Sequence, residues 1–248
     1  MPCISALMIQ TQLFSAGTVL NEFHLLTASE CSHWCDVLHS ASSHWKRRAR
    51  GIDFYTLGAA YYLDVDDDAF VSYSLRFEKM NPLLYELFAD LYRLILGRFE
   101  KLFGCPFYFH DGLALPGFTF WPRPGRLPSF LNPAFFDRGG TIHNHPMPRC
   151  FAELIGCLPD DLPPDFDSVT NPLCLPASGG GLNLWPNGVD DDKPIYYPYS
   201  VGHAVQFAGE LRHQIAPYRP ALMVSRPEYR ITLQCHFFRM QGSAILFF

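Results

Sequence analysis

The sequence lacks the signals that mark several large classes of protein. Its eight cysteines include no CxxC pair, which argues against a zinc ribbon and is typical of free thiols in a reducing compartment. The first residues lack the charged region and the small-residue cleavage site of a signal peptide. No apolar run reaches the roughly 18 residues of a membrane span. We therefore expect a cytoplasmic protein that does not bind a membrane.

The sequence also has no large excess of charge of either sign. The 19 basic and 24 acidic residues leave a net charge of −5, so there is no electrostatic reason to expect nucleic acid as a partner. The one basic run, at residues 46–50, is short and is typical of a solvated loop. The chain also has no P-loop, nucleophile elbow or dinucleotide fingerprint, so none of those enzyme classes is indicated.

The composition that remains is that of an ordinary globular protein. The 248 residues are 48% hydrophobic and 17% charged, which fits a single domain over residues 1–248. Aromatic residues make up 15% of the chain, and they favour an aromatic-lined core or pocket. The sequence does not indicate an oligomeric state.

The two parts of the chain differ in style. Residues 1–104 are predicted to be mainly helical: Thr27 and Glu30 form a capping box, and a second helix is expected from Asn81 as its cap to a stop at Gly104. Residues 105–248 contain short β-type runs between proline, glycine and aspartate clusters, a pattern typical of a barrel or sandwich. The predicted fold class is α+β, with helices packed outside a β core.

Three histidines are candidates for a metal site. Residues i and i+2 of a strand point to the same side, so His143 and His145 in GGTIHNHP can face one point. His213, in HQIAP, lies on a later β run that could line the same site. Three neutral imidazoles from two edges of a β barrel form a facial site with open positions, as in non-haem iron enzymes. The alternative is that the first two are polar side chains ending a strand.

Arg230 and Thr232 are candidates for binding an anion. A guanidinium binds a carboxylate through two parallel hydrogen bonds, and a hydroxyl two residues along the same strand faces the same way. The surrounding strand, YRITLQCHF, is mostly apolar, so an inward Arg230 would need an anionic partner such as a bound carboxylate. The alternative is a surface salt bridge.

These motifs occur in the order HxH, HQIAP and RIT, which resembles that of a known family. The chain is similar to the Fe(II)/2-oxoglutarate-dependent dioxygenases, whose double-stranded β-helix carries HxD, a distal histidine, and an arginine followed by serine or threonine at +2. The likeness is stronger to a branch involved in small-molecule biosynthesis, and it covers roughly residues 55–240. It rests on the phrases YTLGAAYYLDV, LPGFTFW, GGTIHNH, LPASGGGLNLW, HQIAP and RITLQ.

The resemblance implies a cofactor, a cosubstrate and a residue for each role. Fe(II) would be held by His143, His145 and His213, while Arg230 and Thr232 would hold 2-oxoglutarate; O2 would be the oxidant. The expected activity is oxidation of a small, amino-acid-like metabolite by a dioxygenase-type oxidoreductase. The expected walls of the substrate pocket are Phe118, Thr119, Phe120, Trp121, Asn183 and Trp185.

The chain departs from the family pattern at His145, where the family has aspartate. An imidazole leaves the Fe(II) centre one charge more positive than a carboxylate would. His145 could ligate the metal, swing away to leave an open position such as halogenases use for chloride, or mark a site that is degenerate or holds another metal. Thr119 also stands where we expect a histidine in this branch.

Two other functions follow if 2-oxoglutarate is not used. One is a three-histidine oxygenase with thiol-dioxygenase-like chemistry, in which the substrate itself chelates the iron. The other is a non-catalytic barrel that binds a small carboxylate. His110, His203 and His236 are expected to have structural or turn positions.

Overall fold

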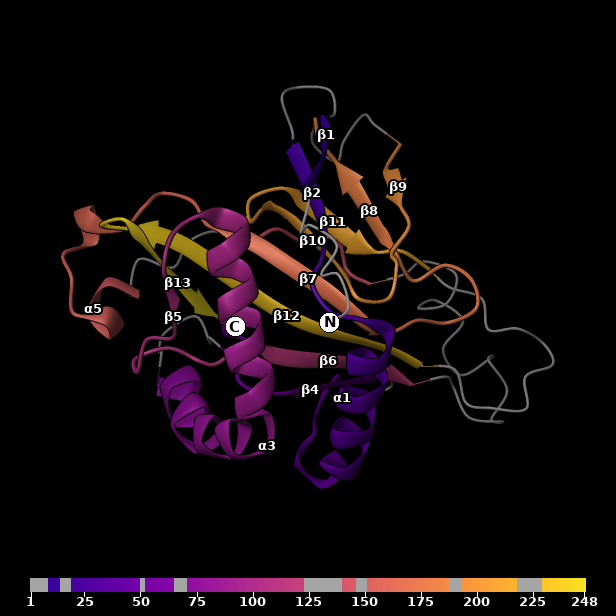
Figure 1. Ribbon diagram of the computed structural model, residues 1–248, viewed down its shortest axis with the longest axis horizontal. Helices are drawn as coiled ribbons and strands as arrows, with labels where there is room; N and C mark the ends of the chain where they lie inside the picture. The colour runs from indigo at the N-terminus through magenta and orange to yellow at the C-terminus, as the bar shows by residue number, and fades with distance from the viewer. Residues whose placement is uncertain are drawn as a thin grey trace, which may run out of the picture.

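The chain folds as an α+β protein in which two sheets form a double-stranded β-helix and helices cover one of them (Figure 1). The computed structural model describes residues 9–13, 19–49, 52–64, 71–122, 140–145, 151–187, 193–217 and 229–248. Among these residues, the large sheet has the order β1-β2-β10-β7-β12-β6-β4-β3, with β13 and β5 added beside β12. The small sheet has the order β11-β8-β9.

The bounds of the elements follow the expected alternation of helices and short strands. The helices are α1 (Ala28–Ser40), η2 (Ser42–His44), α2 (Tyr61–Asp64), α3 (Val71–Phe103), α5 (Phe151–Ile155) and η4 (Pro159–Asp161). The strands are β1 (Gln10–Leu13), β2 (Val19–His24), β3 (Lys46–Ala49), β4 (Ile52–Leu57), β5 (Phe107–Tyr108), β6 (Gly117–Pro122), β7 (Asp167–Cys174), β8 (Leu182–Trp185), β9 (Ile195–Tyr197), β10 (His203–Ala208), β11 (Arg212–Ile215), β12 (Tyr229–Met240) and β13 (Ser243–Phe247).

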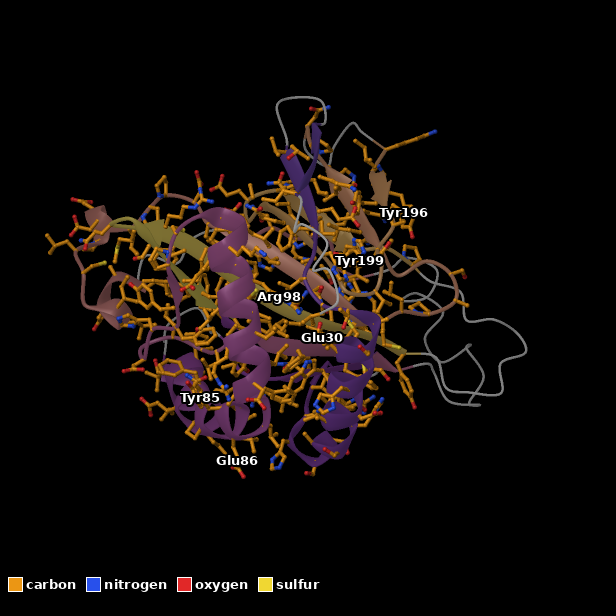
Figure 2. The ribbon with its side chains drawn as sticks, in the orientation of Figure 1. Glu30, Tyr85, Glu86, Arg98, Tyr196 and Tyr199 are labelled. Atoms are coloured by element: carbon orange, nitrogen blue, oxygen red, sulfur yellow. The ribbon has the colours of Figure 1, made fainter. Side chains whose placement is uncertain are left out.

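The predicted capping box at the start of α1 is present. The Thr27 hydroxyl accepts from the Glu30 amide at 3.2 Å, and the Glu30 carboxylate accepts from the Thr27 amide at 2.7 Å. Glu30 also pairs with Arg98 of α3 at 2.9 Å, so that the two helices are joined to each other on one face of the sheet (Figure 2). Burial alone would raise the pKa of Glu30, but the hydrogen bonds from Arg98 and Thr27 outweigh it and lower the pKa to about 2.

Helix α3 is longer than the sequence pattern predicts, and the prediction of Asn81 as its cap is wrong. The helix runs from Val71 to Phe103 with Pro82 inside it and a kink at Phe88 (φ −127°, ψ 17°). The Asn81 side chain instead binds the loop after β5, donating to the Leu113 carbonyl and accepting from the Leu115 amide. Gly104 ends the helix in the left-handed region as expected, at φ +68°. No described helix is both long and apolar enough to cross a membrane.

The first 104 residues carry the long helices and also contribute strands to the large sheet. Strands β1 and β2 form one edge of the large sheet, and β3 and β4 form the other. Residues 46–49 of the basic run form strand β3 and not a solvated loop, and the side chain of Arg48 is buried and contacts the Asp64 carboxylate at 2.7 Å, while residue 50 lies outside the described residues. The N-terminal part therefore supplies both edge strands of the large sheet and helices that cover it.

Strand β12 separates the helix side of the molecule from the site. Its odd-numbered residues from Ile231 to Phe237 belong to the hydrophobic core that includes α1 and α3. Because side chains alternate along a strand, its even-numbered residues point to the opposite face. These are Arg230, Thr232, Gln234 and His236, and they face the small sheet.

Replacing Gly117 with alanine is expected to destabilise the fold. A Cβ at this position on β6 would lie 2.0 Å from the Phe248 ring and 2.8 Å from the Leu57 carbonyl oxygen. Phe248 is fully buried, so its ring has little room to move, and overpacking of this kind costs about 1–3 kcal/mol. Urea unfolding measures the loss in free energy of unfolding.

Gly97 supplies a matched control for this substitution. It lies inside α3, where an added Cβ would meet no heavy atom within 4 Å, and alanine is preferred over glycine in a helix by about 0.5–1 kcal/mol. We expect Gly97→Ala to be neutral or stabilising. Equal stabilities for the two variants would contradict the close packing of Phe248 on Gly117.

Candidate metal centre

The segment that carries His143 and His145 lies along strand β11 and extends the small sheet. His143 and His213 are directly opposite each other and exchange both backbone hydrogen bonds, at 3.0 and 2.9 Å. Gly140 donates to the Ile215 carbonyl, and His145 donates to the Gly209 carbonyl. Residues far apart in the sequence are thus fixed side by side by backbone contacts alone.

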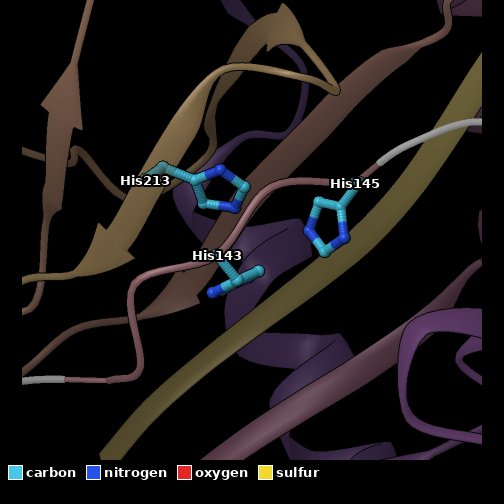
Figure 3. Close-up of side chains that lie close together, drawn as sticks. All are labelled: His143, His145 and His213. Carbon is cyan, nitrogen blue, oxygen red and sulfur yellow. The ribbon is translucent and has the colours of Figure 1, made fainter. Parts of the chain in front are cut away.

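The three imidazoles meet on one side of this ladder (Figure 3). The ring centroids are 4.8 Å apart for His143 and His145, 4.4 Å for His143 and His213, and 5.0 Å for His145 and His213. One nitrogen from each ring lies within 4.8 Å of the others. Three facial ligands at about 2.1 Å from a cation would be about 3 Å from one another, so each ring would have to move inward by roughly 1 Å to bind one.

Two of the rings have the tautomer that ligation requires. The Nδ1 atom of His143 is 2.7 Å from the Thr141 carbonyl, and the Nδ1 atom of His213 is 2.7 Å from the Leu211 carbonyl. A carbonyl only accepts, so each Nδ1 carries the proton and each Nε2 keeps its lone pair for a metal. The Nδ1 atom of His145 is buried and has no hydrogen-bond partner among the described residues.

The electrostatic surroundings keep all three rings neutral at neutral pH. Burial lowers the pKa of His143, and burial together with the nearby His143 lowers the pKa of His213 to about 3. The pKa of His145 is well below its usual value because of burial and the neighbouring His236, His213 and His143. Three neutral nitrogen donors, two of them buried and that of His143 partly buried, fit a divalent ion of intermediate softness, and Fe(II) is one of these.

Tyr62 and His236 also border the centre, and sequence analysis did not single out either as part of it. The Tyr62 ring lies 4.5 Å from the His145 ring and 6.2 Å from the His143 ring. Its hydroxyl donates to Gln234 on the site face of β12 at 2.9 Å. The His236 ring is 5.1 Å from the His145 ring. Alternation along YRITLQCHF places His236 on the same face as Arg230, which is the signal that could have found it.

Arg230 and Thr232 lie on the site face of β12, and both are buried. The Arg230 Nε donates to the Gly180 carbonyl at 2.9 Å, and its guanidinium lies 5.6 Å from the centre of the Tyr199 ring. Thr232 shares a 2.7 Å hydrogen bond with Thr119 on β6. The surface salt bridge considered as an alternative for Arg230 is therefore wrong, because a side chain that is 1% exposed does not lie at the surface.

Tyr62, which packs on His145, also senses the positive charge of Arg230. Burial raises the pKa of Tyr62, and the guanidinium groups of Arg48 and Arg230 partly counteract that rise. Tyr62 packs on His145 at the same time. Tyr62 is therefore influenced both by the charge of Arg230 and by contact with the imidazole of His145.

The structure corrects four of the six expected pocket walls. Phe118 and Phe120 point to the helix side of β6, where Phe118 packs on Phe88 and Phe120 packs on Trp45. Asn183 and Trp185 are on β8 beside β11, but they alternate with Leu184, which is the register partner of His213. Their side chains therefore leave the strand on the side opposite His213.

Thr119 and Trp121 are the expected pocket residues whose side chains lie on the site face. Trp121 is the register partner of Arg230 and stacks on Phe54 at 4.0 Å. Thr119 is the register partner of Thr232. These two positions flank the predicted carboxylate-binding residues.

The remaining histidines lie outside the group of three. The His110 Nδ1 accepts from the Gly112 amide at 3.1 Å, which is a local turn contact. His203 is 42% exposed and lies 3.2 Å from the Glu22 carboxylate. Neither ring belongs to the cluster of candidate ligands among the described residues.

Comparison with a solved structure identifies the fold. The chain aligns with an N-substituted L-amino acid dioxygenase from Burkholderia ambifaria AMMD, solved in complex with α-ketoglutarate, at a TM-score of 0.51 and 11% identity over 92% of this chain and 86% of that one. The chain has the fold of a 2-oxoglutarate-dependent dioxygenase. The expectation of a double-stranded β-helix with flanking helices is thereby confirmed.

Two further solved structures align over most of their length. A Pseudomonas putida prolyl-4-hydroxylase gives a TM-score of 0.41 at 16% identity, covering 96% of this chain and 95% of that one. The α-ketoglutarate-dependent epimerase SnoN from nogalamycin biosynthesis gives 0.48 at 11% identity, covering 90% and 81%. No family model matches the sequence, and no curated protein matches it.

Proposed function

We propose that this protein is a non-haem Fe(II) oxygenase that uses 2-oxoglutarate to oxidise a small, amino-acid-like metabolite. The observation that carries the proposal is the convergence of three neutral imidazole nitrogens within 4.8 Å of one another. They converge in a dioxygenase fold, and a buried arginine lies on the neighbouring face of β12.

Each residue has one role in this proposal. His143, His145 and His213 would hold the iron, while Arg230 and Thr232 would hold the far carboxylate of 2-oxoglutarate through charge-assisted hydrogen bonds. Thr119 fixes the Thr232 hydroxyl, and Tyr199 packs against the Arg230 guanidinium. When bound, iron and 2-oxoglutarate would supply the oxidising power to break a carbon–hydrogen bond with O2.

The chain itself orients the ligands and excludes water. Tyr62 covers the face of the centre formed by His143 and His145, and its hydroxyl is fixed by Gln234. Trp121 would form an apolar wall beside Arg230. The structural neighbour from Burkholderia ambifaria acts on an N-substituted L-amino acid, and this supports an amino-acid-like substrate.

The all-histidine donor set favours one second candidate. Without a carboxylate ligand the centre would keep the full charge of the divalent cation, as in oxygenases that bind the substrate directly to iron. In that case Arg230 would hold the carboxylate of the substrate and 2-oxoglutarate would not be needed.

The setting proposed for this enzyme is the reducing cytoplasm, with a small molecule as its partner. The cysteines of the described residues are free thiols: Cys31, Cys35, Cys105, Cys157, Cys174 and Cys235. Burial raises the pKa of Cys31 to about 11, so this thiol stays protonated and unreactive at neutral pH.

Binding of Fe(II) and 2-oxoglutarate under anaerobic conditions tests the proposal. We expect a visible charge-transfer absorption when both are present, because the keto acid must chelate the iron through two oxygens to produce it. Zn(II) in place of Fe(II) is the control and should give no band. Bound iron without a band would favour the second candidate, and failure to retain iron would favour a non-catalytic carboxylate-binding barrel.

A further inference from the structure

His145 differs from the other two histidines in how its ring is held. His143 and His213 each donate from Nδ1 to the carbonyl of the residue two positions earlier, Thr141 and Leu211. The corresponding carbonyl for His145 is that of His143, but the Nδ1 atom of His145 makes no hydrogen bond to it or to any other described residue. His145 therefore needs a partner from elsewhere, because a ligating histidine almost always donates its second ring N–H to an acceptor.

His236 is the neighbour in position to be that partner. Its ring lies 5.1 Å from the His145 ring, and only 4% of the residue is exposed. Its Nδ1 lies 3.0 Å from the Ser168 hydroxyl on β7. Its Nε2 and the Nδ1 of His145 are both buried and have no hydrogen-bond partner among the described residues. The two nitrogens do not bond to each other in this structure, but they belong to neighbouring rings, and two buried nitrogens without partners call for an explanation.

We propose that His236 positions His145 for metal binding through a chain of hydrogen bonds. In this chain the His145 Nδ1–H donates to the His236 Nε2, and the His236 Nδ1–H donates to the Ser168 hydroxyl oxygen. The lone pair of the His145 Nε2 is then directed into the centre. The inference rests on the proposed function, because it takes His145 as a ligand.

The same three groups allow only one other arrangement of protons. If the Ser168 hydroxyl donates to the His236 Nδ1, then the His236 Nε2–H donates to the His145 Nδ1. The His145 Nε2 would then carry a proton and could not bind a cation. Both arrangements contain the same number of protons, so a metal can select the first without releasing a proton to solvent.

Two of the rings around His236 are phenyl groups, which pack against it without taking part in this chain. Phe166 and Phe247 pack against it at 5.1 and 5.4 Å. They offer no hydrogen-bonding atoms, so a change in either alters the packing and leaves the chain intact. This makes Phe166 a suitable control position.

Co(II) binding, followed by its visible absorption, tests the positioning role. Loss of a hydrogen-bond partner behind a metal ligand typically weakens metal binding by about 10–100-fold, and we expect this for His236→Phe. His236→Gln keeps an acceptor and should restore most of the affinity, while Phe166→Leu should bind as the wild type does. Wild-type affinity in His236→Phe, or equal losses in all three variants, would overturn the proposal.

A measurement on the unmodified chain decides the question even if His236→Phe fails to fold. Nitrogen-15 NMR of the Zn(II)-loaded wild-type protein reports the tautomer of each histidine. We expect His236 to carry its proton on Nδ1, and a proton on Nε2 in the metal-loaded protein would overturn the proposal. Failure to bind Zn(II) or Co(II) at all would instead remove the proposed metal centre itself.

Discussion

The His213→Ala variant is expected to lose its bound iron. His213 is the single candidate ligand contributed by β11, and its Nε2 is left free by the hydrogen bond from Nδ1 to Leu211. Two imidazoles would remain, two positions apart on one short segment. The loss in affinity should exceed the roughly 10–100-fold that follows removal of a partner behind a ligand. Metal analysis after gel filtration measures the iron retained per chain.

His110→Ala serves as the control for this prediction. His110 is partly buried like His143, but it makes a local contact with the Gly112 amide and lies outside the cluster. We expect it to retain iron as the wild type does. Full iron retention by the His213 variant would show that the iron binds elsewhere on the chain.

The Arg230→Ala variant is expected to bind iron normally and 2-oxoglutarate poorly. Hydrogen bonds to charged groups contribute about 1.5–3 kcal/mol, and each 1.4 kcal/mol is tenfold in affinity. The dissociation constant for 2-oxoglutarate should therefore rise by about 10–150-fold. Titration of the charge-transfer band in the anaerobic Fe(II) protein measures it directly.

Arg230→Lys separates the loss of charge from the loss of geometry. Lysine keeps the positive charge but not the planar pair of donors, so this variant should fall between the wild type and Arg230→Ala. If iron is retained and 2-oxoglutarate binds equally well in all three proteins, Arg230 does not hold the cosubstrate. The second candidate function would then predict weaker substrate binding in the same variants.

The sequence predicted the residues of the centre because their pattern is local or periodic. The spacing of His143 and His145 places both rings on one side of an extended segment, and that arrangement is present. The separation of Arg230 and Thr232 by two residues likewise places both on the site face of β12. The alternation of side chains along a single strand can be read from the sequence itself.

The pocket walls could not be predicted because they depend on which face of each strand is turned toward the site. LPGFTFW contains two interleaved faces, and the register of β6 on β12 selects Thr119 and Trp121. Phe118 and Phe120 are more apolar, and for that reason they lie in the core below α3 and α1. The contact between His236 and His145 also depends on the pairing of distant strands, so no spacing in the sequence reports it.

The limits of α3 were mispredicted for a related reason. Asn81-Pro82 has the form of a helix start, yet residues 71–80 continue the same apolar spacing and bury Tyr73, Phe77 and Met80. Because Pro82 has no backbone N–H, the helix lacks one hydrogen bond. The burial of the apolar side chains before and after it stabilises the helix by more than that bond would. Tertiary packing therefore decides where this helix begins.

The exchange of backbone hydrogen bonds between His143 and His213 has a consequence for how such a centre can change. Main-chain contacts set the distance between the two segments, and these contacts do not depend on which side chains the segments bear. A substitution at residue 145 can therefore alter the charge and chemistry of the donor set while the frame that presents it stays intact. The ladder makes this position open to exchange in evolution and in the laboratory.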